Sequence, residues 1–324
     1  MTLYRSVLVS CMLFSAGLSA VGAQPYPSKM IRIVSPYAPG GGTDIMARTI
    51  AQKISENMNV QCIVENRPGG GGIVGTEVVV KSLPDGYTLL LGSKGPLVVN
   101  PALHEKLPFD TLRDLAPISL VAIVPAVLVV HPSVPVKSVD DLIALARSRP
   151  GQLTFSSSGN GGTGHLSGEQ FAALAKIKLV HVPYRGTGPA TVAILSGEIS
   201  FGFANLVAIA PFVQSNRLRP IAVTSRKRLQ ASPEIPTVAE SGLSAYEYVT
   251  WYGVLTTNGT NKDIVSKLNH EIVKISNSSD MKMKLTSEGG EAVSSTPLEF
   301  QNYIKSELIE AQKIVKLSRI KLQK

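Results

Sequence analysis

Cysteine is scarce in this sequence. There are only two, and Cys11 lies in an N-terminal segment that we expect to be removed, which leaves Cys62. A single thiol cannot form an intramolecular disulfide, and the five histidines show no metal-ligand spacing that would complete a zinc site. We therefore expect a fold held by its hydrophobic core, with no disulfide, no metal and no cofactor.

Apolar runs long enough to cross a membrane are also missing. The run from Val7 to Leu18 is shorter than the roughly 20 residues that a spanning helix needs. It follows a single basic residue, Arg5, and leads to the small-x-small end Val21-Gly22-Ala23. This order is typical of a secretory signal peptide. We predict a leader at residues 1–23, cleavage after Ala23, and a mature protein in the periplasm.

Aromatic residues make up only 6% of the chain, although its formal net charge is +9. With few aromatics and no nucleic-acid-binding module, this charge is typical of a solvated surface, and we expect no nucleic-acid partner. Its long-range field would favour anionic solutes. Neither a G-x-S-x-G elbow nor an H-E-x-x-H pair is present. The sequence therefore does not indicate an enzyme, and a secreted α/β enzyme is kept only as a remote alternative.

Strand-like apolar runs alternate with helical patterns along most of the chain. This alternation is typical of parallel sheets covered by helices on both faces, and the length of the chain exceeds one ordinary core. The apolar run Leu120–His131 contains Pro125, which favours two strands that meet at a bend. The predicted fold class is α/β with two lobes, each a mostly parallel sheet flanked by helices.

A first glycine-rich turn lies between a predicted strand and a predicted helix. Glycines allow the backbone N–H groups to approach a ligand, and the start of the helix favours a negative charge. Asp44 would repel an anion beside it, so we expect it to stabilise the first helical turn or to orient a water or a ligand donor. A tight turn with a good helix start is the alternative interpretation. The turn reads Tyr37-Ala38-Pro39-Gly40-Gly41-Gly42-Thr43-Asp44.

A second glycine-rich turn also connects a strand to a helix. Its hydroxyl and amide groups can donate to a carboxylate, and in open α/β sheets ligands lie beyond the carboxyl ends of the strands. Two such turns from different lobes predict a shared cleft. His165 either lines this cleft or packs behind it. The turn reads Ser156-Ser157-Ser158-Gly159-Asn160-Gly161-Gly162-Thr163-Gly164-His165.

A third glycine-rich turn, Asn66–Gly75, matches the spacing of a dinucleotide-binding fingerprint. The acidic residue that such a site needs about 20 positions further on is missing, since Glu77 and Asp85 come too soon. We therefore do not assign this turn to a site. Trp251 and Tyr252 are interpreted as core aromatics, with a cleft wall as the alternative.

Six motifs follow one another along the chain after the leader. They are Tyr37–Asp44, Val64-Glu65-Asn66-Arg67-Pro68-Gly69, Pro84-Asp85-Gly86-Tyr87-Thr88-Leu89-Leu90, His181-Val182-Pro183-Tyr184-Arg185-Gly186, Leu218-Arg219-Pro220-Ile221-Ala222-Val223-Thr224-Ser225 and Pro236-Thr237-Val238-Ala239-Glu240-Ser241-Gly242. With these motifs in this order, the chain resembles the Bug (TctC-like) family of extracytoplasmic solute receptors.

This resemblance implies a type II periplasmic-binding-protein fold whose lobes close on the solute. It places residues 24–125 and 248–324 in lobe 1 and residues 126–247 in lobe 2. It also implies that the first two glycine-rich turns hold the ligand's carboxylate, partly through water. The candidate ligand-binding residues are Tyr37, Pro39, Gly40, Gly41, Gly42, Thr43, Asp44, Ser93, Ser157, Ser158, Gly159, Asn160, Gly161, Thr163, His165 and Asn205.

One segment departs from the family. Where relatives often read Val-Asp-Leu-Met-Phe-Asp-Asn, this chain reads Ile199–Asn205 without either acid. The position before Asn205 is expected near the cleft, so we predict a dicarboxylate or an aromatic carboxylate without an essential amine. The resemblance further implies a monomer that serves the membrane permease subunits of a tripartite tricarboxylate transporter. A sensor or orphan receptor without its own permease is the alternative.

Overall fold

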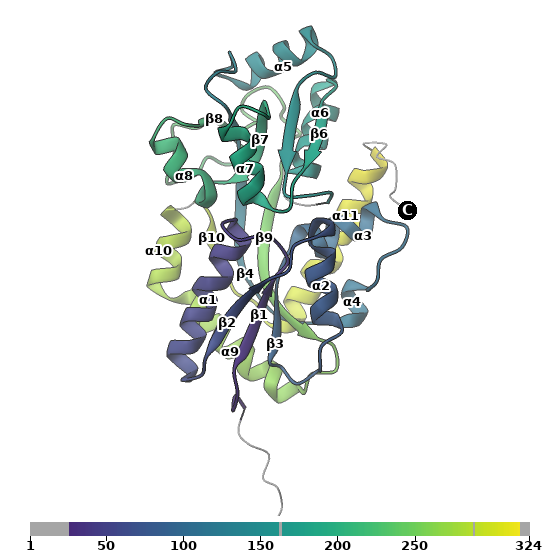
Figure 1. The fold of residues 1–324 in the computed structure, drawn as a ribbon, viewed down its shortest axis with the longest axis vertical. Helices are drawn as coiled ribbons and strands as arrows, with labels where there is room; N and C mark the ends of the chain where they lie inside the picture. The colour runs from purple at the N-terminus through teal and green to yellow at the C-terminus, as the bar shows by residue number, and fades with distance from the viewer. Residues whose placement is uncertain (1–25, 162–163, 288, 318–324) are drawn as a thin grey trace, which may run out of the picture.

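The computed structural model describes residues 26–161, 164–287 and 289–317. The predicted leader and residues 318–324 lie outside these ranges. Figure 1 shows two halves stacked along the long axis, joined by long strands that run through the middle. Within the described residues, no helix combines the length and the apolar character needed to cross a membrane.

The first half is built on three parallel strands in the order β2-β1-β3. Ile31 and Ile33 of β1 are fully buried, which is why this β-branched run forms a central strand. Helix α1 follows β1, and α2 follows β2. The bounds are β1 Ile31–Ser35, α1 Gly42–Met58, β2 Cys62–Asn66, α2 Ile73–Val80 and β3 Thr88–Ser93.

Two long antiparallel strands connect the halves. Strand β4, Leu115–Val130, pairs with β9, Val249–Thr257, as far as Pro125, and from Ala126 onward it pairs with strands of the second half. The prediction of two strands that meet at Pro125 is therefore wrong, because β4 is continuous. Its partners change at that proline, since a residue without an N–H is tolerated where a ladder ends.

The second half repeats the strand–helix alternation. Strand β5 lies between β6 and β7 and is parallel to both, whereas β7 and β8 are antiparallel to β4. The α/β prediction is confirmed, with antiparallel connecting strands inside otherwise parallel sheets. The bounds are α5 Val139–Ser148, β5 Thr154–Ser157, α6 His165–Ala175, β6 Val180–Pro183, α7 Thr187–Leu195, β7 Phe201–Asn205, α8 Leu206–Gln214 and β8 Arg219–Val223.

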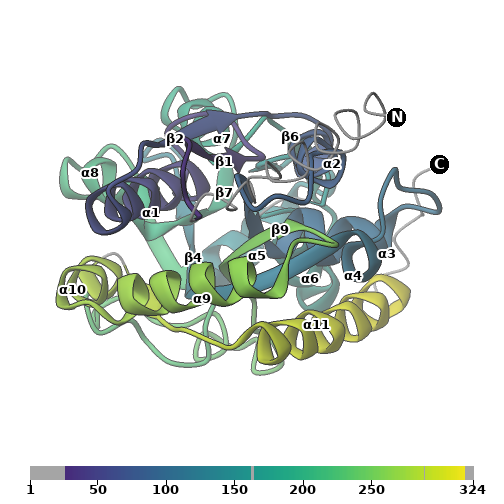
Figure 2. The same ribbon diagram turned by 90° about the horizontal axis from the view of Figure 1, so that it is seen from below.

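The C-terminal helices return to the first half. Figure 2 shows α9, α10 and α11 together along one side of the molecule, with α1 and α2 on the other side of the strands. Trp251 of β9 is fully buried, and its ring meets that of Phe300 of α11 edge-on at 5.4 Å. The remaining bounds are η1 Gly70–Gly72, η2 Gly95–Val99, α3 Asn100–Leu103, α4 Thr111–Asp114, α9 Lys262–Asn277, α10 Ser279–Ser287, β10 Glu291–Ala292 and α11 Pro297–Leu317.

Candidate functional site

The first glycine-rich turn is held by the carboxylate of Asp44. This side chain is buried and accepts hydrogen bonds from the Gly40 N–H at 3.1 Å, from Asn66 Nδ2 at 2.9 Å and from Arg48 Nε at 3.1 Å. Burial alone would raise the pKa of Asp44, but the hydrogen bonds from Arg48, Asn66 and Gly40 outweigh it and lower the pKa. Asp44 is therefore ionised and ties the turn to the first turn of α1.

The start of α1 meets the second half of the molecule. Helix α1 begins at Gly42 without a side-chain cap, so N–H groups of its first turn are open to a ligand. A Cβ on Gly42 would lie 2.6 Å from Asn205 Nδ2 and 2.6 Å from the Tyr252 hydroxyl. Asn205 donates to Tyr252, while its Oδ1 is buried without a partner among the described residues. The side chain of Tyr252 packs in the core as predicted, and its hydroxyl also reaches a candidate site residue.

The second turn is organised by Ser157. Its Oγ accepts the Gly159 N–H at 3.2 Å and lies 2.5 Å from His181 Nε2. The ring of His181 stacks in turn on Phe155 at 5.0 Å. Gly159 adopts φ +125°, a conformation in which a side chain is strained. Ser157 therefore fixes the turn from within, and His181 positions Ser157.

A pair of stacked histidines lies behind this turn. The rings of His165 and His181 are 4.1 Å apart and nearly parallel, and His165 Nδ1 accepts the Gly161 N–H at 3.0 Å. Burial lowers the pKa of His165 to about 4, and burial together with the neighbouring His165 lowers that of His181 to about 3. Both rings are therefore neutral at physiological pH. His165 therefore supports the turn through Gly161 and stacks on His181.

The third glycine-rich turn, which the sequence did not assign to a site, lies against the second. A Cβ on Gly71 would lie 1.8 Å from the Asn160 carbonyl oxygen, and one on Gly159 would lie 3.0 Å from Gly71 Cα. The Gly71 carbonyl accepts the Tyr37 hydroxyl at 3.1 Å and Asn100 Nδ2 at 3.2 Å. The glycines are needed here because two backbones touch. All three turns lie between a strand and a helix, and this shared position in the sequence could have identified the third turn as part of the site.

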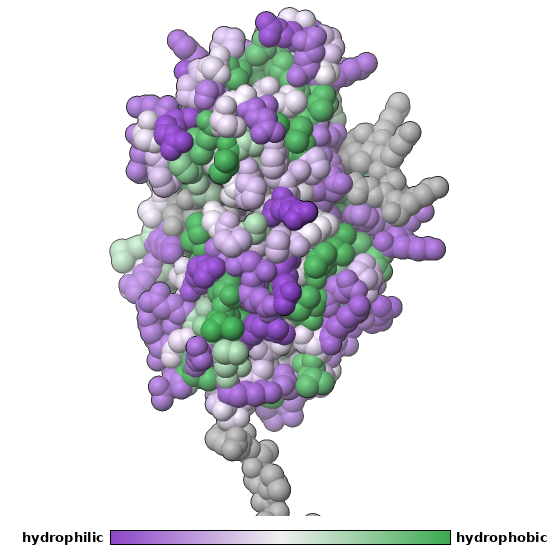
Figure 3. Space-filling view, in the orientation of Figure 1, coloured by the Kyte–Doolittle hydropathy of each residue, from purple (hydrophilic) through white to green (hydrophobic). Residues whose placement is uncertain are grey.

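The two halves are in contact around these turns. The Ala38 N–H donates to the Arg185 carbonyl at 3.1 Å, and a Cβ on Gly188 would lie 2.9 Å from the Pro39 carbonyl oxygen. Gly41 faces Thr187 in the same region. On the face drawn in Figure 3, the surfaces of the two halves meet without a wide opening between them. The structure is therefore a closed arrangement.

Several buried polar groups lie at or beside the ends of β1, β3, β7 and β9. Each belongs to a residue that is at most 3% exposed, and none has a hydrogen-bond partner among the described residues. The Ser93 hydroxyl lies beside that of Tyr37, whose own proton is already donated to Gly71. Such groups are costly to bury unless a ligand or water satisfies them. They are Ser35 Oγ, Ser93 Oγ, Asn205 Oδ1, Tyr248 OH and Thr250 Oγ1.

The position before Asn205, which was expected near the cleft, is Ala204. It is 3% exposed and belongs to an apolar cluster of the second half with Val129 and Ile194. Thr163 lies outside the described residues. Within the part of the chain that the structure describes, no group of three His, Cys, Asp or Glu side chains is placed to hold a metal ion.

Comparison with known proteins identifies the family. The model of the family described as "Tripartite tricarboxylate transporter family receptor" matches residues 46–320. The chain belongs to this family. Protein BugT of Bordetella pertussis strain Tohama I is 34% identical over 318 residues, which cover 98% of both chains. A protein from the tcbD–tcbE intergenic region of Pseudomonas sp. strain P51 is 37% identical over 291 residues, 90% of this chain and 86% of the relative.

Solved structures agree with this assignment. Rpa4515 of R. palustris with adipate has a TM-score of 0.89 and 33% identity, covering 91% of this chain and 98% of the other. MatC of Rhodopseudomonas palustris with bound malate has a TM-score of 0.86 and 26% identity, covering 90% and 100%. The family resemblance predicted from the motifs is confirmed. As a member of the tripartite tricarboxylate transporter receptor family, the chain is a solute-binding receptor of the Bug type and not an enzyme.

Proposed function

We propose that this receptor binds a small organic carboxylate between its two halves in the periplasm and delivers it to the permease subunits of a tripartite tricarboxylate transporter. The observation that carries the proposal is the set of buried polar atoms without partners, Ser93 Oγ and Asn205 Oδ1 among them, beside the open start of α1. Similar receptors are described with adipate and with malate, both dicarboxylates. The expected ligand is a dicarboxylate or an aromatic carboxylate.

In this proposal the ligand's carboxylate lies between the first and second glycine-rich turns. N–H groups at the start of α1 and the Ser93 hydroxyl would donate to it from the first half, and the Ser158 region would donate from the second. Asp44 stays outside the contact, since its oxygens are taken by Gly40, Asn66 and Arg48. Asn205 would accept from a bridging water or a ligand hydroxyl.

The two lobes proposed to close on the ligand are residues 24–125 with 248–324, and residues 126–247. The exchange of partners along β4 at Pro125 supports this boundary, as does the start of β9 at Val249. A ligand that contacts both lobes binds the closed form better than the open form and so shifts the population toward closure.

Titration calorimetry of the ligand-free mature protein tests the binding step. A panel of organic acids is compared with the corresponding primary amides, which keep the shape and lose the charge. We expect binding of acids only, and a weakening of about tenfold to a hundredfold in Ser93→Ala, because one charge-assisted hydrogen bond is removed. Ser306→Ala, an exposed serine of α11, is the matched control and should bind normally. Equal binding of acids and amides would refute a carboxylate site.

Uptake and location need separate measurements. Cells that lack this chain should fail to take up the labelled ligand, and the wild-type chain should restore uptake where Ser93→Ala does so only at higher ligand concentration. Undiminished uptake without the chain would instead favour a sensor. Sequencing the N-terminus of the protein from the periplasmic fraction should begin at Gln24.

A further inference from the structure

The hydroxyl of Tyr248 is an unused hydrogen-bonding group at the junction of the two halves. Tyr248 is 3% exposed, and its position is fixed by a backbone hydrogen bond to the Thr224 carbonyl at 2.9 Å. Its hydroxyl has no partner among the described residues. Burial raises its pKa, and the Tyr37 hydroxyl of the first glycine-rich turn and the Glu307 carboxylate add to this. The hydroxyl is therefore protonated and lies near the candidate site.

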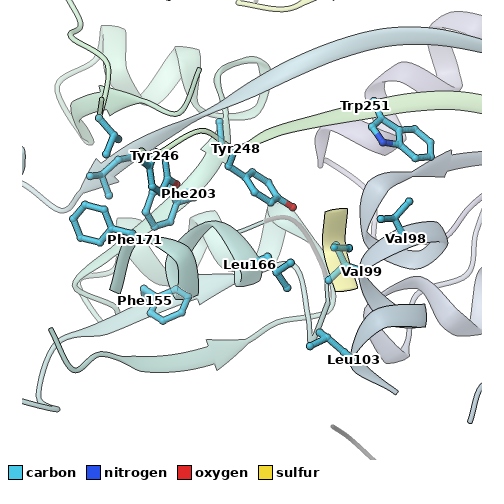
Figure 4. Packing of buried hydrophobic residues seen from close by; sticks show 14 of the residues in the cluster. Val98, Val99, Leu103, Phe155, Leu166, Phe171, Phe203, Tyr246, Tyr248 and Trp251 are labelled. Atoms are coloured by element: carbon cyan, nitrogen blue, oxygen red, sulfur yellow. The ribbon is translucent and has the colours of Figure 1, made fainter. Parts of the chain in front are cut away.

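The side chain of Tyr248 packs among apolar residues of both halves. Tyr248 packs in one buried cluster with Val99 of the first half and Leu166 of the second, which directly follows His165. Figure 4 shows the Tyr248 hydroxyl directed away from Phe203 and Tyr246 and toward the region bordered by Val99 and Leu166. A ligand that extends from the turns in this direction would meet an apolar wall and one hydroxyl.

The one cation beside this wall among the described residues is already neutralised. Lys94, which directly follows Ser93, lies 5.2 Å from the centre of the Tyr248 ring, and its Nζ is 2.9 Å from Glu307 of α11. The pair is largely buried, with 12% and 16% of the side chains exposed, and Trp251 Nε1 donates to Glu307 at 3.2 Å. Separating a buried ion pair is strongly unfavourable, so Lys94 is not available to a ligand.

Two other basic side chains near the turns are paired or exposed to solvent. Arg48 is paired with Asp44, and Arg185 is exposed. Glu169 lies one turn from Leu166 on the same face of α6, is partly buried, and forms no ion pair with any described residue. Burial raises its pKa. A second carboxylate at this end would be buried without a cation, which carries a large cost.

We infer that the site selects carboxylates with an apolar body whose far end is a neutral hydrogen-bonding group, such as a phenol or an alcohol, over dicarboxylates of the same length. In this arrangement the Tyr248 hydroxyl recognises the far end, and the Lys94–Glu307 ion pair leaves no unpaired charge beside it. The inference rests on the proposed carboxylate-binding function, but it places hydroxy acids ahead of the dicarboxylates expected there.

Two matched ligand series test this on the mature, ligand-free protein by titration calorimetry. The aromatic series is 4-hydroxybenzoate, benzoate and terephthalate, and the aliphatic series is 6-hydroxyhexanoate, hexanoate and adipate. We expect the hydroxy acid to bind about tenfold more tightly than the parent acid, and the diacid to bind most weakly, in at least one series. Tyr248→Phe should remove the hydroxy-acid advantage while the parent acid binds within about threefold of wild type.

Tyr246→Phe is the matched control, because Tyr246 is a buried tyrosine of the same cluster whose hydroxyl already pairs with Ser167. It should keep the ligand order of the wild type. If the diacid binds most tightly in both series, or if Tyr248→Phe keeps the hydroxy-acid advantage, the inference is wrong and the carboxylate function stands. If no carboxylate binds, both fail. The order of ligand affinities in the wild-type protein tests the inference even if a variant does not fold.

Discussion

The first and second glycine-rich turns have the same position, between a parallel strand and a helix, but they are held in different ways. The first is fixed by an ionised carboxylate, Asp44, that gathers Arg48, Asn66 and the Gly40 N–H. The second is fixed by neutral groups, since Ser157 bonds within the turn and the stacked rings of His165 and His181 lie behind it. One support depends on a charge being present, and the other depends on charges being absent.

The first and second turns also differ in how closely other residues pack against them. Among the described residues, no heavy atom beyond the two chain neighbours lies within 4 Å of a Cβ placed on Gly40, whereas a Cβ placed on Gly159 meets the backbone of Gly71. The second turn is therefore confined by the third, while the first keeps open space at its tip. Two turns with similar glycine-rich sequences therefore differ, since the first has space for a side chain at Gly40 and the second has none at Gly159.

The largest expected effect follows from the contact between the second and third turns. Gly71→Val would place a Cβ 1.8 Å from the Asn160 carbonyl oxygen at φ +62°, so the halves could not close. We expect binding to weaken at least about a hundredfold while the thermal midpoint changes little. Gly40→Ala, with φ +85° but free space, is the matched control and should cost about tenfold at most. Equal affinities in the two variants, measured by calorimetry, would contradict the confinement.

Acid should weaken the neutral support of the second turn. The folded-state pKa of His165 is about 4, below the 6.5 of an unperturbed histidine, so the unfolded chain takes up a proton first as the pH falls. The contribution of His165 to stability should therefore decline by about 3 kcal/mol between pH 6.5 and pH 4, and His181, whose folded-state pKa is about 3, adds a decline that continues to lower pH. His165→Asn keeps an acceptor for Gly161 and should flatten this decline. Urea unfolding measures the free energy of unfolding of both proteins across the pH range. If this free energy falls with pH equally in both, His165 is not the cause of the decline.

Removing the charge of Asp44 should affect the first turn less severely. Asp44→Asn loses the ion pair with Arg48, and we expect a loss of about 2 kcal/mol in stability and about tenfold in ligand affinity. Because the folded-state pKa of Asp44 is lowered, its contribution is present at neutral pH and is lost as the pH falls through that value. Asp280→Asn, an exposed acid of α10, is the control for urea unfolding. If Asp44→Asn binds the ligand with wild-type affinity, Asp44 does not contribute to ligand binding.

The smallest effect concerns Tyr252. Tyr252→Phe removes the partner of Asn205 Nδ2 across the junction of the halves, and we expect a loss of about 1 kcal/mol in stability and about threefold in affinity. Calorimetry and thermal unfolding measure the two losses. An affinity loss as large as that of Asp44→Asn would mean that Tyr252 contacts the ligand directly.

Elements with a clear period were predictable from the sequence. The helices predicted after the first and second glycine-rich turns are present as α1 and α6, because their apolar positions repeat at helical spacing. Strand β4 was predicted wrongly because Pro125 signals a break, whereas here it marks a change of partners.

The site was predictable only where the residues are local in sequence. The two assigned turns are contiguous motifs, but the third turn becomes part of the site only through Asn100 and Asn160, which are distant in the chain. The stacking of His181 and the unpaired hydroxyl of Tyr248 likewise depend on tertiary contacts. Spacing in a sequence does not report such contacts.

A structure of the mature protein with its tightest carboxylate tests the central claim most directly, by the distances from the carboxylate oxygens to the turns. The account predicts hydrogen bonds of about 2.7–3.2 Å, direct or through one water, to the start of α1 and to the Ser157–His165 turn at once. A carboxylate held by one half alone, or bound away from both turns, would contradict it.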